Sequence, residues 1–521
     1  MRYVIAYDLG TGGLKSSLFD ENGVSLASDF KSCETYYPTA DFREQRPLEW
    51  WDMVVRSTKD LLDKLREKSI DPRGIAAAAF SGHSLGVVPI GADGVLLLDS
   101  VPVWFDARAS RQAAEVFTRL DEEQWYLTTG NGFPAHLYAA FKILWYKENM
   151  PDIYGAADKF IGTKDYLNYK LTGALATDYS YASGSGVYDL EACAYRDDYI
   201  EAFGLVRGKF PELRESASVL GRIKKDVALE LGLPDDLLVA AGGVDNACMA
   251  AGAGCVEDGM AYTSLGTSAW VAVSSHKPVV NFKTKPFVFG HLIKGMYASA
   301  EPLFSAGNTF RWVRDILCAD LKEIEASGGE DAYKAMDRLA AASPVGANGL
   351  CFTPTLGGGS ALDRCAATRG AIVGLDLMHT RGDVIRAALE GVCLGLRMSL
   401  GELRKEVKLS DEMLIVGGGS KSPFWRQLFA DIYGMDITES AVGENAGSLG
   451  AMACAAISAG MWKDFTPLIG LNKPISVTKR NPDNMVRYEA VYDLFLKVSE
   501  SQNDIAEYKE KILEPWQSLK E

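Results

Sequence analysis

The chain lacks the cysteine and histidine spacings that mark disulfide frameworks and metal sites. Its nine cysteines are scattered, no two stand in a CxxC pair, and nine is an odd number. The five histidines include no HExxH motif. A disulfide framework, a structural zinc site and a zinc hydrolase are therefore disfavoured, and free thiols fit a reducing cytoplasm.

Long apolar runs and an excess of positive charge are also missing. No run of about 18 apolar residues suggests a membrane span, and "MRYVIAYDLG" shows no signal-peptide apolar region before it turns polar. The formal net charge is −15 and the pI is near 5.0, which disfavours nucleic acid and anionic membranes as partners. We therefore expect a cytoplasmic protein that binds neither. Anionic ligands stay open, because local backbone N–H groups or lysines can bind them.

The composition is that of a folded globular protein, with 47% hydrophobic and 24% charged residues. At 521 residues the chain is too long for one ordinary core, so two or more domains are expected. Strand and helix patterns alternate along it, which indicates an α/β fold.

The first eighty residues predict a meander, a helix and a buried strand. Residues 3–8 and 13–20 form two strand patterns around a Gly-rich turn, and an Asn-Gly turn leads to a third. Residues 45–65 have helical periodicity with Pro47 at the start. The continuous apolar run 74–82 is typical of a strand buried on both faces.

A second cycle of the same design begins near residue 238. "YDLGTGGLKSSL" and, within 259–275, "TSLGTSAWVAV" both read as strand, L-G-T turn and strand, a weak internal repeat that indicates two similar halves. Residues 414–434 predict a strand, a glycine turn and a helix, and 485–521 an amphipathic helix. We place the domain boundary within 238–246.

The glycine turns match neither common phosphate-binding motif. The chain has no GxxxxGK[ST] loop, and "DLGTGGLK" is not a GxGxxG opening a helix. A pair of facing β-hairpin turns is the alternative, with Gly10 and Gly12 letting backbone N–H groups approach a polyphosphate. Asp8 beside phosphate then requires a bridging cation such as Mg²⁺. The competing interpretation is that the turns are simple tight hairpins.

Asp245 follows two glycines at a strand end in "AGGVDNACMAAGAG". A carboxylate placed there can accept the proton of a substrate hydroxyl during phosphoryl transfer. Asp is also a favoured N-cap before a helix. The residues alone leave both roles open, and the two roles can coexist.

Nine segments, in order along nearly the whole chain, resemble the FGGY carbohydrate kinases, which include xylulose, ribulose, gluconate and glycerol kinases. They are DLGTGGLKSSLFDENG, EQRPLEWW, PVWFDARA, GTKDYLNYKLTGALATDYSYASGSGVYD, GGVDNACMAAGAG, SLGTSAWV, RGAIVGLDLMHTRGDVIRAALEGV, VGGGSKSPFWRQLFADIYG and ENAGSLGAMACAA. The last two resemble motifs on the adenosine side of the family's site.

This resemblance implies an α/β fold of two actin-like (ribonuclease H-like) ATPase domains hinged around a central catalytic cleft. Residues 1–242 would hold the sugar side and the first phosphate turn, and residues 243–521 the nucleotide side and the second turn. The implied activity is ATP- and Mg²⁺-dependent phosphorylation of a terminal hydroxyl of a ketose or polyol. Family members are often dimers, so the resemblance also implies a homodimer.

The resemblance also assigns residues. Asp245 is implied as the general base, with Asp8 and Asp245 at the metal. The residues implied on the nucleotide side are Gly10, Thr11, Gly12, Lys15, Gly266, Thr267, Ser268, Gly307, Gly418, Gly419 and Ser422. The residues implied on the sugar side are His83, Ser84, Trp104, Asp106, Asp245 and Asn246. Three of them have ordinary alternatives: His83 and Trp104 as core residues and Lys15 as a solvent-exposed side chain.

The sugar motifs depart from the family pattern at two places. Xylulose kinases read close to S-G-Q-M-H-G where this chain has "SGHSLG", so Leu85 takes the usual histidine position and His83 stands two places earlier. Gly358 and Gly359 replace the charged residues of G-E-R-x-P. The Arg-Glu pair of glycerol kinases is absent. D-Xylulose, giving D-xylulose 5-phosphate, is the expected substrate, with another pentulose, a tetrulose, a pentitol or an autoinducer-2-like molecule as alternatives.

Two other function classes compete with a kinase. One is a non-catalytic sugar- or nucleotide-binding relative, which would tolerate the loss of Asp245, but the chain keeps Asp8 and Asp245. The other is an actin- or chaperone-like ATPase with a protein partner, which would not be expected to carry "PVWFDARA" together with "GGVDNACMAAGAG".

Overall fold

The chain forms two compact units in the computed structural model, which describes residues 1–359, 362–365, 367–440 and 442–517. Unit 1 comprises Met1–Asp258, Ser274–Ser299 and Asn445–Asn472, and unit 2 comprises Gly259–Val273, Ala300–Glu444 and Lys473–Glu521. Each unit is therefore assembled from three separate stretches of sequence.

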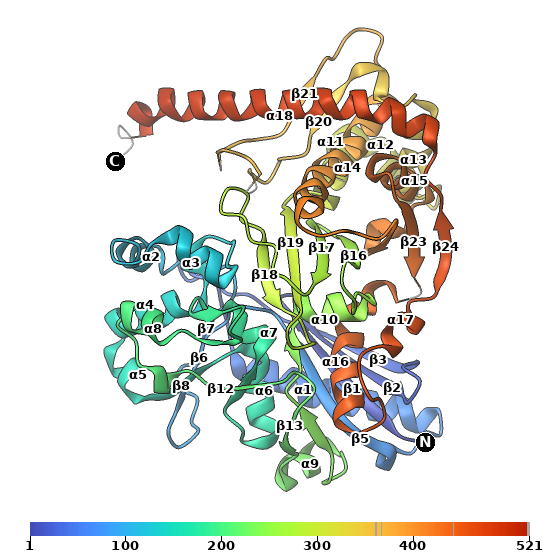
Figure 1. Cartoon of the computed structure of the whole chain (residues 1–521). Coiled ribbons are helices and arrows are strands. Elements are labelled where there is room, and N and C mark those ends of the chain that lie inside the picture. The colour runs from blue at the N-terminus through green and yellow to red at the C-terminus, as the bar shows by residue number, and fades with distance from the viewer. Residues whose placement is uncertain (360–361, 366, 441, 518–521) are drawn as a thin grey trace. The chain divides into compact units, whose positions relative to one another are not determined.

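Unit 1 is built on a mixed sheet whose first three strands form the predicted antiparallel meander (Figure 1). β1 pairs in parallel with β5, and β5 with β14, so the buried central strands follow the continuous apolar runs. The strand order is β13-β14-β5-β1-β2-β3. The bounds are β1 (Tyr3–Gly10), β2 (Gly13–Asp20), β3 (Ser25–Ser32), β5 (Ile75–Gly82), β13 (Val219–Arg222) and β14 (Leu238–Ala240).

Helix α1 (Pro47–Glu67) covers this sheet with an apolar stripe. Pro47 stands in its first turn, where the missing N–H is no loss. Trp50, Val54 and Leu61 are fully buried in the core of unit 1. Burial of three such side chains contributes roughly 5–9 kcal/mol relative to exposure, so the core and not the helix propensity holds α1 in place.

Two helices made of small residues pack tightly in unit 1, although the sequence separates them by almost two hundred residues. These are α10 (Asp245–Gly252) and α16 (Ala446–Ser458). A Cβ added to Gly252 would lie 1.8 Å from the Ala446 carbonyl oxygen, and one added to Gly450 would lie 2.2 Å from that of Cys248. The backbones therefore touch where only glycine fits.

The other elements of unit 1 are short and surround the sheet edge. Their bounds are β4 (Glu44–Gln45), β6 (Val88–Gly91), β7 (Val101–Pro102), α2 (Ser110–Val116), α3 (Glu122–Thr129), α4 (Ala139–Asn149), α5 (Pro151–Ala156), β8 (Ala157–Ile161), α6 (Thr163–Thr172), β9 (Ala176–Asp178), α7 (Tyr179–Ala182), β10 (Tyr188–Asp189), β11 (Ala194–Tyr195), α8 (Asp197–Ala202), β12 (Glu212–Arg214), α9 (Lys225–Leu231), β15 (Gly243–Val244), β18 (Phe287–Gly290) and α17 (Pro467–Leu471).

Unit 2 repeats the same sheet design, as the internal repeat predicts. β16 pairs antiparallel with β17 and in parallel with β22, and β22 pairs in parallel with β23. The strand order within unit 2 is β19-β17-β16-β22-β23-β24. The bounds are β16 (Ala261–Leu265), β17 (Ala269–Ser275), β19 (Tyr297–Leu303), β20 (Cys351–Thr353), β21 (Ala371–Val373), β22 (Glu412–Val416), β23 (Asp436–Ser440), β24 (Pro474–Thr478), α11 (Gly307–Leu317), α12 (Ala319–Ala326), α13 (Ala332–Ala342), α14 (Arg381–Glu406), α15 (Pro423–Tyr433) and α18 (Pro482–Gln517).

The division into units differs from the expected boundary at 242/243. Asp245 and α10 belong to unit 1, and α16 returns to unit 1 from the far end of the chain. The physical reason is the close contact between α10 and α16, which pattern reading along the chain does not reveal.

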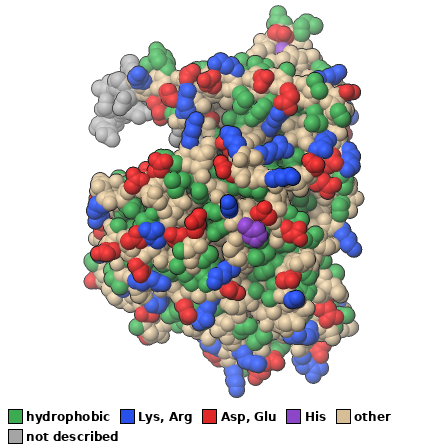
Figure 2. All heavy atoms as spheres, in the orientation of Figure 1, with side chains coloured by type: hydrophobic (Ala, Val, Ile, Leu, Met, Phe, Trp, Pro, Cys, Tyr) green, Lys and Arg blue, Asp and Glu red, His purple; other side chains and the backbone are tan. Residues whose placement is uncertain are grey.

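Two expected absences can be compared with the structure. All nine cysteines are free thiols, in agreement with the prediction of no disulfide framework. Within the described ranges, no helix combines the length and apolarity needed to cross a membrane. Figure 2 shows acidic and basic side chains interspersed on the face in view.

Candidate active site

Asp8 stands near the end of β1, in a row of polar residues that crosses three strands. In the strand register, Lys15 of β2 and Ser81 of β5 are its direct neighbours on either side. Burial raises the pKa of the Asp8 carboxyl, while the Ser81 hydroxyl and the Lys15 ammonium pull it down. The sheet thus holds a carboxylate in a poorly solvated place.

The start of α16 closes over this row. The Lys15 ammonium donates a short hydrogen bond to the side-chain oxygen of Asn445. A Cβ added to Gly447 would lie 2.5 Å from Asp8 Oδ2, so only glycine lets the helix backbone approach the carboxylate. Sequence reading linked the "ENAGSLG" segment to the adenosine side, whereas the structure puts its helix in unit 1 beside Asp8.

Asp245 is the first residue of α10, directly after the two-residue strand β15 that pairs with β5. The N-cap position belongs to Val244, and the Asp245 carboxylate accepts a 2.8 Å hydrogen bond from the Asn246 N–H. Both Asp245 and Asn246 are half-buried. The helix N-terminus therefore orients the carboxylate without enclosing it.

The carboxylates of Asp8 and Asp245, both in unit 1, repel each other. Burial, and then the charge of Asp8, raise the pKa of Asp245 from 3.8 to about 7. A divalent cation would remove this repulsion, so the pair fits Mg²⁺, which prefers carboxylate, water and phosphate oxygens. In the part of the chain that the structure describes, no cluster of three or more His, Cys, Asp or Glu side chains could hold a metal.

His83 and Leu85, the third and fifth residues of the predicted sugar motif "SGHSLG", are each only 1% exposed. The His83 ring lies edge-on to Trp50, with ring centroids 5.8 Å apart. Burial lowers the pKa of His83 to about 4, so its imidazole is neutral near pH 7. Leu85 has a left-handed backbone, with φ of 60°. Both ring nitrogens of His83 are buried without a hydrogen-bond partner among the described residues, so its sugar-side role stays a prediction beside the core alternative. Ser84, 8% exposed, lies between these two enclosed side chains.

Trp104, in the segment "PVWFDARA", is hydrogen-bonded to the turn between β1 and β2, which is the predicted first phosphate turn. Its indole N–H donates a 3.0 Å hydrogen bond to the Thr11 hydroxyl, and Gln45 donates to the Thr11 carbonyl at 2.8 Å. Trp104 is half-buried, and Phe105 packs edge-on to its ring. The turn residues Thr11 and Gly12 stay at least partly exposed, as a ligand-binding turn requires.

Asp106 is enclosed by other residues of the protein and is not accessible to solvent. It is fully buried, and its two oxygens accept hydrogen bonds from the backbone N–H groups of Arg43 and Arg108 and from the Arg108 guanidinium, at 2.6 to 3.1 Å. Arg108 also pairs with Glu44 at 2.6 Å. No carboxylate oxygen of Asp106 is left for a sugar in this arrangement, so its environment supports a role in holding the Trp104 segment.

A buried lysine stabilises the same region through hydrogen bonds to its backbone. Lys142 of α4 is fully buried and donates to the carbonyl oxygens of Leu85, Val103 and Trp104 at 3.0, 2.7 and 3.4 Å. Burial lowers the pKa of Lys142 to about 7. Sequence reading missed this residue, because "FKILWYKEN" looks like an ordinary amphipathic helix.

Unit 2 contains a cavity of about 610 Å³, a size typical of small-ligand pockets. Six residues predicted for the nucleotide line it together, from the β16–β17 turn, the start of α11 and the turn after β22: Gly266, Thr267, Gly307, Gly418, Gly419 and Ser422. Sequence reading missed further lining residues on or near α11 and α13, among them Arg311, Asp331, Tyr333, Lys334 and Asp337.

Glycines shape this cavity by letting backbone segments touch. A Cβ added to Gly307 would lie 2.3 Å from the Gly266 carbonyl oxygen, and Gly417 has φ of 97°. The Gly307 N–H donates to that same Gly266 oxygen at 3.0 Å. Ser422 caps α15 and donates a 2.6 Å hydrogen bond to Asp337. The β16–β17 turn is thus fixed to the N-terminus of α11.

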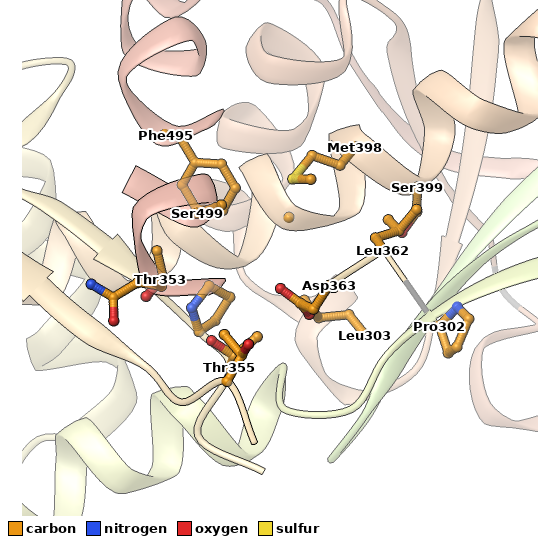
Figure 3. A pocket seen from close by; sticks show the side chains of 14 residues that line it. Pro302, Leu303, Thr353, Thr355, Leu362, Asp363, Met398, Ser399, Phe495 and Ser499 are labelled. Carbon is orange, nitrogen blue, oxygen red and sulfur yellow. The ribbon is translucent and has the colours of Figure 1, made fainter. Parts of the chain in front are cut away.

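A second cavity in unit 2 is much smaller. It measures about 30 Å³ and lies where Phe495 of α18 approaches Met398 of α14 and Leu303 of β19 (Figure 3). This volume accommodates about one water molecule, so the cavity is a packing defect beneath α18 and not a ligand site.

Comparison with known proteins relates both units to one family. Residues 3–252 and 261–459 match the models described as the N-terminal and C-terminal domains of the FGGY family of carbohydrate kinases. A xylulose kinase from Staphylococcus epidermidis is 30% identical over 493 residues, which cover 94% of this chain and 95% of that protein. The solved structures of a ligand-bound xylulose kinase and a gluconate kinase, both from Lactobacillus acidophilus, each show a TM-score of 0.87 at 26% identity, covering 96% of this chain and 98% of theirs.

Proposed function

The chain belongs to the FGGY family of carbohydrate kinases, and we propose that it transfers the γ-phosphate of ATP to the terminal hydroxyl of D-xylulose. The observation that carries this proposal is Asp245, a half-buried carboxylate whose pKa of about 7 suits a general base near neutral pH. It directly follows the short strand β15, and the charge of Asp8 contributes to its raised pKa.

The proposed reaction is a direct in-line transfer. Asp245 accepts the proton of the sugar hydroxyl while the hydroxyl oxygen attacks the γ-phosphorus and ADP leaves. The nucleotide is proposed to bind the 610 Å³ cavity of unit 2, with Gly266 and Thr267 of the second turn near its phosphates. Gly10, Thr11, Gly12 and Ser268 are proposed as further backbone and hydroxyl donors to the phosphates.

Asp8 and Asp245 are proposed to hold Mg²⁺, which when bound neutralises phosphate charge in the transition state. Their mutual repulsion and raised pKa values support this pairing. Lys15, held by Asn445, keeps a positive charge next to Asp8 and limits the repulsion when the metal is absent.

A neutral sugar fits unit 1 better than gluconate, although the two Lactobacillus structures are equally similar. Two of the cationic side chains that hold the Trp104 segment already have hydrogen-bond or ion-pair partners within the protein. Arg108 pairs with Asp106 and Glu44, and Lys142 donates to three carbonyl groups. Neither can turn to a substrate carboxylate without leaving buried polar partners unsatisfied, which costs several kcal/mol. This favours a ketose, with Ser84, Trp104 and Asn246 as proposed contacts.

A coupled ADP-release assay with Mg·ATP tests the proposal. The panel comprises D- and L-xylulose, D- and L-ribulose, erythrulose, the matching pentitols, erythritol, glycerol, gluconate and tetrahydroxypentanedione. We expect the highest kcat/KM with D-xylulose. A higher value with gluconate would contradict the charge argument, and no turnover with any sugar would contradict the kinase proposal.

Two further properties of the enzyme stay predictions. A homodimer is expected by analogy with the family, and light scattering coupled to size-exclusion chromatography measures it. A cytoplasmic location is expected from the free thiols and the acidic composition, and cell fractionation measures that.

A further inference from the structure

A fully buried ionic cluster is hydrogen-bonded to residues 241–244, which directly precede Asp245, in part through Ser180. Its members are Lys164, Asp165 and Asp178, and none is more than 1% exposed. The Lys164 ammonium pairs with Asp165 at 2.5 Å and with Asp178 at 3.0 Å. A buried cluster of this kind is costly unless every group is paired, and none of these three side chains has a part in the proposed chemistry.

The cluster is hydrogen-bonded to the backbone just before Asp245. Asp178 accepts a 2.5 Å hydrogen bond from the Ser180 hydroxyl and a 2.7 Å one from the Ser216 hydroxyl. The Ser180 oxygen in turn accepts a 3.0 Å hydrogen bond from the N–H of Val244. The chain of contacts therefore runs from Asp178 through Ser180 to the residue adjoining the proposed base.

The other side of the segment is held by the same cluster. Lys164 donates to the Ala241 carbonyl at 3.2 Å, and Asn168 donates to the same oxygen at 2.9 Å. Between these anchors lie two glycines with no room for a side chain. A Cβ on Gly242 would lie 2.0 Å from the Phe80 carbonyl oxygen, and one on Gly243 would lie 3.1 Å from Ser180 Oγ.

We propose that Ser180, oriented by Asp178, is a positioning residue for Asp245. The Ser180 hydroxyl fixes the Val244 N–H and thereby the direction in which the chain leaves β15 and enters α10. Glycine-rich backbone has many alternative conformations, so external hydrogen bonds must select the productive one. This inference rests on the proposed role of Asp245 as the base.

Removing this hydroxyl should misplace the base and leave the nucleotide site intact. A displacement of about 1 Å in a reacting group costs about 10²-fold in rate, so Ser180→Ala is expected to lower kcat by 10- to 100-fold. The nucleotide cavity belongs to unit 2, so the KM for ATP should stay within twofold.

The chain offers a matched control in Ser299, which is as fully buried as Ser180. Its hydroxyl also accepts one backbone N–H, from Val279 at 3.0 Å, but that residue does not adjoin Asp245. Ser299→Ala therefore removes a comparable buried hydrogen bond without touching the proposed path. It is expected to keep the kcat of the wild type.

The experiment measures kcat and both KM values for Ser180→Ala, Ser299→Ala and Asp245→Asn. Hydrogen–deuterium exchange of the peptide spanning 241–252 provides a readout that is independent of activity. Faster exchange and the kcat loss are both expected in Ser180→Ala alone. Ser180→Cys, whose slightly larger thiol leaves no cavity but is a weak donor and acceptor, replaces Ser180→Ala if the latter does not fold.

Equal kcat losses in the two serine variants would overturn the inference, because any buried hydroxyl would then have the same effect. So would unchanged exchange and turnover in Ser180→Ala while Asp245→Asn is inactive, and in that case the proposed kinase function would stand. Normal turnover in Asp245→Asn would instead remove the base role, and the positioning inference would fall with it.

Discussion

Replacing Asp245 by Asn should stabilise the folded protein at alkaline pH while destroying its turnover. Asn has the shape of Asp without its charge, and the charge is what burial and Asp8 disfavour. The folded-state pKa of about 7 lies above the ordinary value of 3.8. Between these values the folded state binds more protons than the unfolded state, so this carboxyl makes stability fall as pH rises.

The magnitude follows from the pKa. Each pKa unit corresponds to about 1.4 kcal/mol, so the ionised carboxylate costs at most about 4 kcal/mol above pH 7. Water reaches the half-buried side chain and screens part of this cost, so we expect about 1–3 kcal/mol. The cost is fully present above pH 7 and vanishes below pH 4. Turnover of Asp245→Asn should drop by about 10²- to 10⁴-fold.

The assay is thermal unfolding of wild type and Asp245→Asn at pH 5 and pH 8, in chelator and without nucleotide. The variant should unfold a few degrees higher than the wild type at pH 8, and the difference should shrink at pH 5. Asp235→Asn, which alters an exposed carboxylate, controls for general effects of charge. Parallel pH dependence of wild type and Asp245→Asn would refute the reasoning, because Asp245 would then carry no buried charge.

Four further predictions concern the same groups. Gly307→Ala places a Cβ 2.3 Å from the backbone of the β16–β17 turn and should raise the KM for ATP at least tenfold, whereas Gly401→Ala in α14, with open space around it and no place in the cavity lining, should not; steady-state kinetics decide. Gly447→Ala, whose Cβ would lie 2.5 Å from Asp8, should lower kcat at least tenfold and raise the Mg²⁺ concentration for half-maximal rate; a normal Mg²⁺ titration would disprove this. The kcat/KM for sugar should fall as the pH is lowered and Asp245 takes up a proton, with an inflection below pH 7 because bound Mg²⁺ opposes protonation; a flat profile from pH 4 to 9 argues against this base. Mg²⁺ should raise the unfolding temperature of wild type at pH 8 more than that of Asp245→Asn, and equal shifts would exclude the carboxylate pair as the metal site.

The local parts of the fold could be predicted from the sequence because they depend on neighbouring residues. The two L-G-T turns are hairpins between β1 and β2 and between β16 and β17. Pro47 marks the start of α1, and the apolar run 74–82 corresponds to β5, Ile75–Gly82. Each of these elements is set by a turn, a proline or a periodicity that lies within about twenty residues.

The long-range parts could not be predicted in the same way. Helix α16 is a run of small apolar residues, and its sequence does not reveal that Gly447 approaches Asp8 from more than four hundred residues away. Lys142 reads as an ordinary helix lysine, yet burial and three carbonyl acceptors make it a structural cation. Asp106 reads as a sugar ligand, yet Arg43 and Arg108 occupy its oxygens. The partners of Gly447 and Lys142 are distant in sequence, and Asp106 is enclosed by the distant Arg43 together with Arg108, whose direction the sequence does not reveal.

The most direct test of the central proposal is a phosphorus-31 NMR spectrum of the reaction of the protein with Mg·ATP and D-xylulose. The proposed function predicts a phosphomonoester resonance coupled to the two protons on C5 of the sugar, growing as ATP is converted to ADP, and no such resonance with Asp245→Asn. A spectrum that shows only inorganic phosphate and ADP, or a phosphomonoester of equal intensity with Asp245→Asn, would contradict it.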